Sequence, residues 1–232
     1  LAMEKMPHNC LITTSGYDSL TTDSANSASA YATGHKSVVN AMGVYEDSTK
    51  DPFDDPRVEN ISEIVKRSRG MSVGIITQAE STDATPAAMV GHTRRRANQD
   101  YLASEYLEDY HRPDVIMGGG SSRYIPQSES GSKRHDNQNV IQEFKDKGYT
   151  FVTTSKEMMA APSNKPLLGL FKPGTMNVYI DREMLKNPEV LGKYTDQPNL
   201  VNMTKKSLDI LSQNPKGFFA MIEGASIDKQ LH

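Results

Sequence analysis

Short apolar runs recur along the chain, and segments with helical spacing lie between them. Continuous apolar runs are typical of strands that a sheet buries on both faces. The runs that predict strands are residues 9–14, 72–77, 114–117, 149–153, 167–171, 176–180 and 218–222. We therefore expect a sheet whose strands are well separated in the sequence.

Apolar residues at helical spacing predict helices between these runs. The sets are Val58, Ile61 and Val65 before Gly70; Leu102, Tyr106 and Tyr110 before Pro113; Val140 and Phe144 before Gly148; and Val201, Leu208 and Leu211 before the last run. Alternating strands and helices are the pattern of a parallel sheet covered on both faces. The predicted fold class is therefore α/β, a three-layer α/β/α sandwich with a largely parallel central sheet.

One domain is expected over residues 1–232, because the chain has no internal repeat, no heptad pattern and no linker. The glycines at 118–120 follow a predicted strand, and no Lys-Ser or Lys-Thr comes after them. They predict a tight strand-exit turn rather than a phosphate-binding loop. Residues 121–138 are rich in serine and charge, which predicts a mobile surface loop.

Composition narrows the classes of function. The hydrophobic fraction is 36% and the mean hydropathy is -0.59, and no apolar run approaches the length of a membrane-spanning helix. A net charge of -3 gives no sign of a nucleic-acid partner. Cys10 stands beside Leu11 and Ile12, so we expect a buried free thiol, and a single cysteine excludes an intrachain disulfide.

Residues 22–30 are small and polar, and they predict a loop that enters a helix near Ser24 and ends at Gly34. A serine at a helix N-terminus faces unpaired backbone N–H groups, which would stabilise a phosphate on its oxygen. The alternative interpretation is an ordinary helix cap by Asp23 or Ser24.

A second polar segment, residues 82–96, follows the strand predicted at 72–77. Open α/β sheets bind ligands beyond the carboxyl ends of their strands, which is where Asp83 and Thr85 fall. Both offer the hard oxygen ligands that Mg²⁺ takes. Pro86 favours a helix start that would carry Arg96 about three turns away, although three adjacent arginines also fit a solvated basic face.

The last ten residues combine a strand end with a short helix. Glu223 follows the run at 218–222, and a helix from about Ser226 would put Asp228 and His232 at i and i+4 on one face. A carboxylate and an imidazole in this arrangement suit one zinc ion. A solvated helix face is the alternative for such a pair.

Together these three segments resemble alkaline phosphatases. The Asp-Ser-Ala nucleophile motif of that family stands at 23–25, and its Asp-Ala-Thr-Pro-Ala-Ala run stands at 83–88. The family's phosphate-binding arginine, thirteen residues after that aspartate, falls on Arg96. Its Glu-Gly-Ala-Ser-Ile-Asp-Lys-Gln-x-His run stands at 223–232. The resemblance extends from about residue 9 to the last residue and implies an alkaline-phosphatase-like sheet that is incomplete at both ends.

The resemblance implies a metal-dependent phosphomonoesterase, that is, an alkaline phosphatase acting on small phosphate monoesters. Ser24 would attack the phosphorus and form a phosphoserine, and Arg96 would hold two phosphate oxygens. Lys229 would pair with Asp83 and with phosphate. Aspartate at 83 and lysine at 229 match the pattern of typical bacterial enzymes.

The implied cofactors are two Zn²⁺ ions and one Mg²⁺ ion. Asp228 and His232 would bind one zinc ion, and Ser24 would face the other. Thr85 and Glu223 would bind Mg²⁺ directly, and Asp83 would act there through water.

The chain departs from the family pattern at its ends. The upstream aspartate of the family's Ile-Gly-Asp-Gly-Met-Gly type motif and its downstream Asp-His pair and last histidine are not in the sequence. We therefore expect the middle portion of a longer protein. The resemblance also implies a homodimer in the periplasm or outside the cell, and because the chain begins at Leu1, an export signal could lie upstream.

Two alternatives to a phosphomonoesterase remain. One is an inactive relative that binds phosphate or metal. The other is a sulfatase or phosphodiesterase, but a sulfatase would need a motif such as Cys-x-Pro-x-Arg in place of residues 23–25, and a diesterase usually has a threonine nucleophile.

Overall fold

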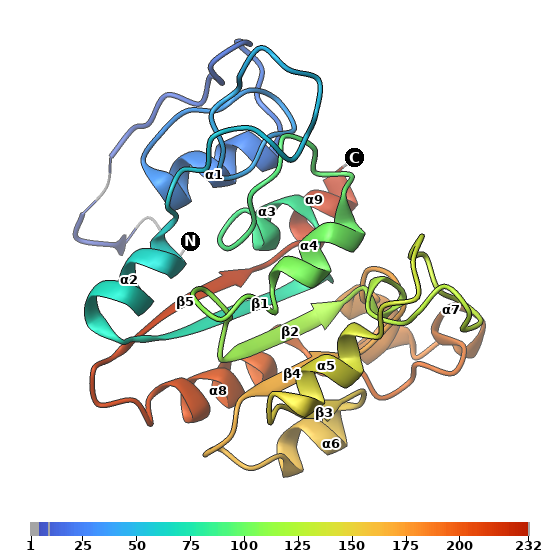
Figure 1. The fold of residues 1–232 in the computed structure, drawn as a ribbon. Coiled ribbons are helices and arrows are strands. Elements are labelled where there is room, and N and C mark those ends of the chain that lie inside the picture. Colours follow the sequence, from blue (N-terminus) through green and yellow to red (C-terminus); the bar gives the residue numbers. More distant parts are fainter. Residues whose placement is uncertain (1–4, 9, 232) are drawn as a thin grey trace.

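The fold is a parallel β-sheet with helices on both faces (Figure 1). The computed structural model describes residues 5–8 and 10–231. Over these residues the strand order is β3-β4-β2-β1-β5, and every pairing is parallel. The strands are β1 (Ser72–Glu80), β2 (Val115–Gly119), β3 (Thr150–Val152), β4 (Leu167–Leu170) and β5 (Phe218–Glu223). The predicted parallel sheet is confirmed.

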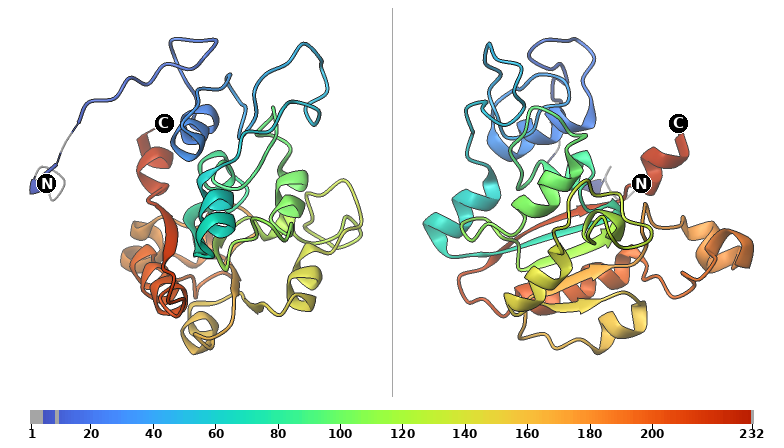
Figure 2. Two further views of the ribbon diagram at one scale, coloured as in Figure 1. Left: turned by 60° about the vertical axis from the view of Figure 1, so that its left-hand side comes forward. Right: turned by 45° about the vertical axis from the view of Figure 1, so that its right-hand side comes forward.

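Helices connect the strands and form the two outer layers (Figure 2). They are α1 (Ser24–Thr33), α2 (Ile61–Arg69), α3 (Ala84–Ala87), α4 (Gln99–Glu105), η2 (Ser121–Arg123), α5 (Val140–Asp146), α6 (Ser155–Ala160), η3 (Ile180–Leu185), α7 (Pro188–Leu191), α8 (Leu200–Leu211) and α9 (Ser226–Leu231). Within the described residues, no helix has the length and apolar character needed to span a bilayer.

Successive residues of β1 pack in two different hydrophobic cores, because neighbouring side chains of a strand point to opposite faces of the sheet. Ile75 packs in the core beneath α1, α3, α4 and α5, whereas Ile76 packs in the core beneath α6 and α8. Two cores on opposite faces of one sheet make the three-layer sandwich that the sequence predicts.

Four predicted helices are present, but two are shorter than their apolar spacing indicated: Val58 lies before the start of α2, and α4 ends before Tyr106. The segments containing Ile61, Val140 and Leu208 form α2, α5 and α8. The helix predicted from Leu102 to Tyr110 ends at Glu105 as α4. At the predicted exit turn after β2, Gly120 has a φ of 92°, in the left-handed region that favours glycine.

Two strand predictions and the prediction for Cys10 are wrong. Residues 10–14 have no strand structure, and Asn9 lies outside the described residues. Leu11 is 102% exposed, so this apolar run packs against no neighbouring strand. Cys10 is exposed in the same segment, not buried. Residues 176–180 lead into η3 instead of forming a strand. Met176 is buried in the core beneath α8, and the backbone N–H of Asn177 donates to the side chain of Gln197 instead of to a neighbouring strand.

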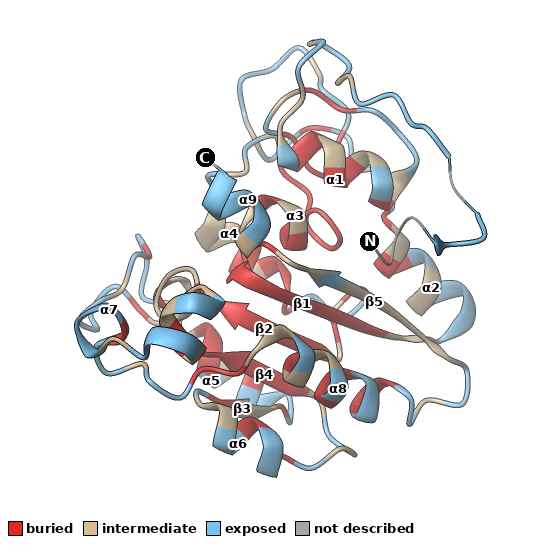
Figure 3. Cartoon of the chain, turned by 180° about the vertical axis from the view of Figure 1, so that it is seen from behind, coloured by how far each residue is buried: buried red, intermediate tan, exposed pale blue. Residues whose placement is uncertain are grey.

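The last strand is also less buried than its sequence suggests. Figure 3 shows β1 buried along most of its length, whereas β5 is mostly of intermediate burial. The reason is that β5 lies at the edge of the described sheet and pairs only with β1. An apolar run therefore predicted the strand correctly but not its depth.

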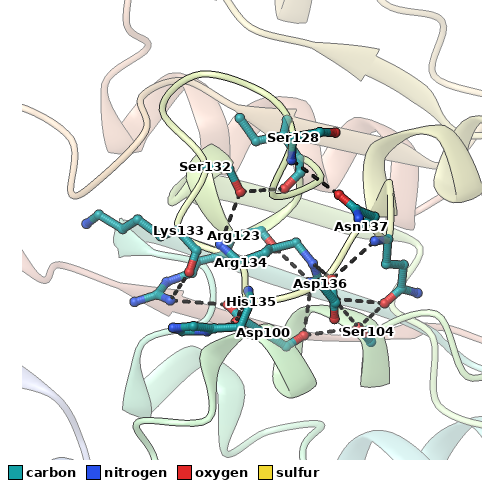
Figure 4. Close-up of polar contacts among 12 residues, drawn as sticks. Asp100, Ser104, Arg123, Ser128, Ser132, Lys133, Arg134, His135, Asp136 and Asn137 are labelled. Atoms are coloured by element: carbon teal, nitrogen blue, oxygen red, sulfur yellow. Dashed lines mark hydrogen bonds and ion pairs between the residues drawn. The ribbon is translucent and has the colours of Figure 1, made fainter.

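The loop at residues 121–138 is irregular, as predicted, but a buried arginine holds its centre (Figure 4). The side chain of Arg134 is only 1% exposed. Its guanidinium donates to the backbone carbonyls of Asp100 and Arg123, at 3.1 and 2.9 Å, and to the carboxylate of Asp136. The expected mobility therefore stays a prediction for the exposed tip at 127–131.

We expect Arg134→Met to lower the free energy of unfolding by about 2–4 kcal/mol, because buried carbonyl acceptors would lose their donors. Cleavage at the 127–131 tip by a protease should become faster at the same time. Lys133→Met is the matched control, since the Lys133 side chain is 53% exposed. Equal urea midpoints for both variants would contradict the anchoring role of Arg134.

Candidate functional site

The predicted site residues gather where β1 and β5 end. Thr77 of β1 lies opposite Glu223 of β5 in the parallel register, so the carboxyl ends of both strands reach the same edge of the sheet. Helices α1, α3 and α9 lie above this edge (Figure 1). This is where an open α/β sheet is expected to bind a ligand.

Ser24 is the first residue of α1, and Asp23 forms the cap. Asp23 Oδ1 accepts from Asn26 N at 3.1 Å, and Asn26 Oδ1 accepts from Asp23 N at 3.1 Å, which completes a capping box. Of the two caps considered from sequence, the structure therefore has the aspartate. The exposed Ser24 hydroxyl is left to contact other groups.

Small side chains bring α1 close to α3. Ala25 and Ala28 of α1 are buried in one core cluster with Ala84 and Ala87 of α3. Alanine keeps the backbones of two packed helices close, so the first turn of α1 lies over the loop that follows β1.

Arg96 lies beside Ser24, but a loop carries it and not a helix. The helix at Pro86 has only one turn, and the prediction that it extends to Arg96 is wrong. Instead Arg96 N donates to Asn40 O at 2.9 Å, which fixes the loop. One guanidinium nitrogen, Nη1, then lies 2.8 Å from Ser24 Oγ.

The neighbouring arginines have other surroundings. Arg94 pairs with Glu46 and donates to Thr49 O at 2.6 Å, and Arg95 is exposed. Only the third arginine therefore joins the group around Ser24.

Two carboxylates hold the Arg96 guanidinium. Nη1 donates to Asp23 Oδ2 at 3.2 Å, and Nη2 donates to Asp83 Oδ1 at 2.9 Å. The Arg96 side chain is 30% exposed, so part of its donor edge still reaches solvent. From the sequence, Asp23 was identified only as a cap and a motif residue. Its contact with Arg96 joins residues far apart in the chain, so no local pattern predicted it.

Asp83 connects Arg96 to Lys229. Asp83 Oδ2 lies 3.2 Å from Lys229 Nζ, and Oδ1 also accepts from Ala84 N at 2.8 Å. Burial would raise the pKa of Asp83, but the Ala84 hydrogen bond and the charges of Lys229 and Arg96 outweigh it and hold the pKa below its ordinary 3.8. Asp83 is therefore ionised at neutral pH.

Glu223 and Thr85 lie next to this carboxylate. Burial raises the pKa of Glu223 above its ordinary 4.5, and the Asp83 charge acts in the same direction, while hydrogen bonds from Thr77 and Thr85 oppose the shift. Two neighbouring carboxylates and a hydroxyl are a donor set that fits a hard divalent cation such as Mg²⁺. The predicted magnesium ligands therefore lie together.

Thr77 is a member of this group that sequence reasoning missed. Its hydroxyl donates to Glu223 Oε2 and accepts from Ala79 N at 2.9 Å. The sequence showed only a threonine inside a predicted strand. Its contact with Glu223 depends on the pairing register of β1 with β5.

The predicted zinc pair is described only in part. Asp228 lies in α9, which begins at Ser226 as predicted; its side chain is 63% exposed and one oxygen is 3.9 Å from Lys229 Nζ. His232 lies outside the described residues. Their joint coordination of zinc therefore stays a prediction.

Comparison with known proteins gives one consistent family. The family model described as Alkaline phosphatase matches residues 1–232. Alkaline phosphatase 4 of Bacillus subtilis (strain 168) is 36% identical over 215 residues, covering 91% of this chain and 40% of the relative. Alkaline phosphatase of Escherichia coli (strain K12) is 32% identical over 259 residues, covering 97% of this chain and 52% of the relative.

Solved structures agree with the sequence relatives. The crystal structure of Thermus thermophilus alkaline phosphatase matches with a TM-score of 0.79 and 26% identity, covering 94% of this chain and 41% of that chain. A cold-active alkaline phosphatase from a Shewanella species matches with a TM-score of 0.70 and 33% identity, covering 93% and 44%. This chain thus spans about half the length of the curated relatives it matches, or less.

Proposed function

Because this chain belongs to the alkaline phosphatase family, we propose that the whole protein hydrolyses phosphate monoesters through a phosphoserine at Ser24. The observation that carries the proposal is the contact of Arg96 Nη1 with Ser24 Oγ at 2.8 Å, with Asp83 joining Arg96 to Lys229. A hydroxyl that contacts one cation, with a second cation held by the same carboxylate, suits attack on a phosphate dianion, which otherwise repels a nucleophile.

Ser24 is the proposed nucleophile. Its Oγ forms the bond to phosphorus while the bond to the leaving alkoxide breaks, and water later displaces the serine oxygen to release phosphate. Its place at the start of the ten-residue helix α1 adds the helix dipole and unpaired backbone N–H groups to the stabilisation of the phosphoryl charge.

Arg96 is proposed to bind two non-bridging phosphate oxygens through its fork of donors. Asp23 and Asp83 support this function by holding the guanidinium beside Ser24 before substrate arrives. Lys229 is proposed to bind phosphate as a point charge while Asp83 keeps it in place.

Two zinc ions and one magnesium ion complete the proposal. When bound, the zinc ions would supply activation of the attacking and leaving oxygens. Among residues of this chain, Asp228 and His232 would hold one zinc ion and Ser24 would face the other. Thr85 and Glu223 would hold Mg²⁺ directly, with Asp83 acting through water.

We also propose, from the family resemblance, that the protein acts in the periplasm or outside the cell and assembles as a homodimer. Small phosphate monoesters are the proposed substrates.

Ser24→Ala in the whole protein should abolish acid-stable phosphoserine and lower kcat on the order of 10³-fold or more, because the attacking oxygen is lost. The measurement is trapping of labelled phosphate at acid pH, followed by location of the label by mass spectrometry. Ser27→Ala is the control from the same helix. Label that persists at the wild-type level in the Ser24 variant would refute the nucleophile assignment.

Arg96→Ala should cost about 2–4 kcal/mol in kcat/KM and weaken inhibition by inorganic phosphate, since a charge-assisted contact to the transition state is lost. Arg94→Ala and Arg95→Ala should change both quantities little, because Arg94 is paired with Glu46 and Arg95 is exposed to solvent. Steady-state kinetics of the three variants tests this. Greatest sensitivity at Arg94 or Arg95 would show that the wrong arginine has been assigned.

Thr77→Val should weaken Mg²⁺ binding about 10- to 100-fold, which is typical when a group that orients a metal ligand is removed. Thr77→Ser should restore the affinity, because it returns the hydroxyl that donates to Glu223. Calorimetric Mg²⁺ titration of both variants is the measurement. Equal affinity in the valine and serine variants would mean that Thr77 does not position Glu223.

A further inference from the structure

A second cluster of potential metal ligands lies on the α1–α5 side of the sheet. Glu63 of α2, His92 after α3 and His111 before β2 each offer a ligand atom, and these atoms all lie within 4.8 Å of one another. The three side chains are buried, with exposures of 11%, 1% and 0%. None of these residues belongs to the group around Ser24.

The outer nitrogens of both histidines are engaged by one residue. His92 Nδ1 lies 3.2 Å from Glu105 Oε1, and His111 Nε2 lies 2.8 Å from the backbone oxygen of Glu105. Oxygens of this kind accept from ring N–H groups, so they favour tautomers that leave lone pairs on His92 Nε2 and His111 Nδ1. A histidine that binds a metal usually donates its other ring N–H to such an oxygen.

The two inner nitrogens belong to the cluster and have no partner in good hydrogen-bond geometry among the described residues. His92 Nε2 is 3.2 Å from one oxygen of Glu63, and His111 Nδ1 is 3.7 Å from the other. Buried polar atoms are nearly always satisfied, so two unpartnered nitrogens facing one carboxylate indicate that a further group belongs between them.

We propose that Glu63, His92 and His111 bind a divalent transition-metal ion, with zinc as the fitting ion, at a site separate from the phosphate site. Two imidazole nitrogens and one carboxylate oxygen form a zinc-type donor set. Bonds of about 2.0–2.2 Å would put tetrahedral ligand atoms about 3.4 Å apart, so the cluster has to contract by little more than ~1 Å.

The charges around the cluster leave a place for a cation. Burial works against protonation, but the close contacts with Glu105 and Glu63 and the charges of these carboxylates raise the pKa of His92 to about 9. The pKa of Glu63 is lowered to about 2, since its contacts with His111 and His92 outweigh burial. A metal ion would replace the proton on His92, and Arg57, 3.4 Å from Glu105, balances only that outer carboxylate.

Solvent reaches one side of the cluster. Glu63 lines a cavity of about 470 Å³, whose wall also includes Glu59, Lys66, Tyr110 and Asp114. A buried metal site needs an entry path, and this cavity supplies one to the carboxylate ligand.

The ion would join three segments that the sheet alone does not tie together. It would link α2, the segment after α3 and the segment before β2, and His92 stands four residues before Arg96. The site is therefore structural in kind, closed by protein on most sides.

The test is metal content, measured by mass spectrometry after loading the whole protein with Zn²⁺ and removing excess metal. Wild type and the control His135→Gln, whose side chain is 87% exposed, should hold one more equivalent of zinc than His111→Gln or Glu63→Gln. The comparison is a difference between variants, so ions at the phosphate site cancel, and loss of phosphatase activity alone does not affect it. Equal zinc content in folded variants, checked by circular dichroism, would overturn the proposal.

A second measurement uses the wild-type protein, so it tests the proposal even if the variants fail to fold. Crystals grown with Zn²⁺ should show an anomalous difference peak at the zinc edge among Glu63, His92 and His111. A map with zinc at other sites and no peak here would overturn the proposal and leave a protonated His92 between two carboxylates.

Discussion

The carboxylate of Asp83 joins parts of the site that are far apart in the sequence. One oxygen accepts from Arg96 and from Ala84 N, and the other lies beside Lys229 near the far end of the chain. A half-exposed pair contributes little, but Asp83 is only 20% exposed and so requires balancing charge. Asp83 therefore helps to hold both cations, and the Ala84 hydrogen bond together with the charges of Lys229 and Arg96 keeps its pKa low.

The sheet decides where this carboxylate stands. Parallel pairing of β1 with β5 brings Thr77 opposite Glu223, so a strand that ends about one third of the way along the sequence and one near its end terminate at the same edge. The alanine contacts between α1 and α3 then place Ser24 above that edge. The reactive hydroxyl, its cations and the oxygen ligands come from separate elements, and packing brings them within hydrogen-bond distance.

The group around Ser24 and the cluster around Glu63 differ in how their carboxylates are neutralised. Around Ser24, arginine and lysine side chains neutralise the carboxylates and remain partly open to solvent, which suits an anionic ligand that comes and goes. Around Glu63, the ion pairs among the described residues come from the imidazoles of His92 and His111. That composition suits a resident cation, and the segment from His92 to Arg96 connects the two regions.

Features with local signals could be predicted from the sequence alone. Gly34 ends α1 and Gly70 ends α2 as predicted, and Asp23, one of the two caps considered, begins α1, because caps depend on neighbours only a few residues away. The start of α2 after Asn60 was not predicted. Ser24, Asp83 and Arg96 were found from motifs, and the structure brings them together. Alternation of apolar runs with helical segments was sufficient for the parallel three-layer fold.

Tertiary structure alone decided what depends on distant partners. The run at 218–222 became a strand because β1 pairs with it, whereas 10–14 has no such partner in the described residues and stays exposed. Arg96 is placed by backbone contact with Asn40 and not by a helix, and Thr77 acquires its function from the register. His92 and His111 carry no sequence motif at all, since only the packing of α2 against neighbouring segments brings their nitrogens to Glu63. Local patterns encode helix ends and candidate strands, but which candidates pair and which distant residues meet depends on how the elements pack.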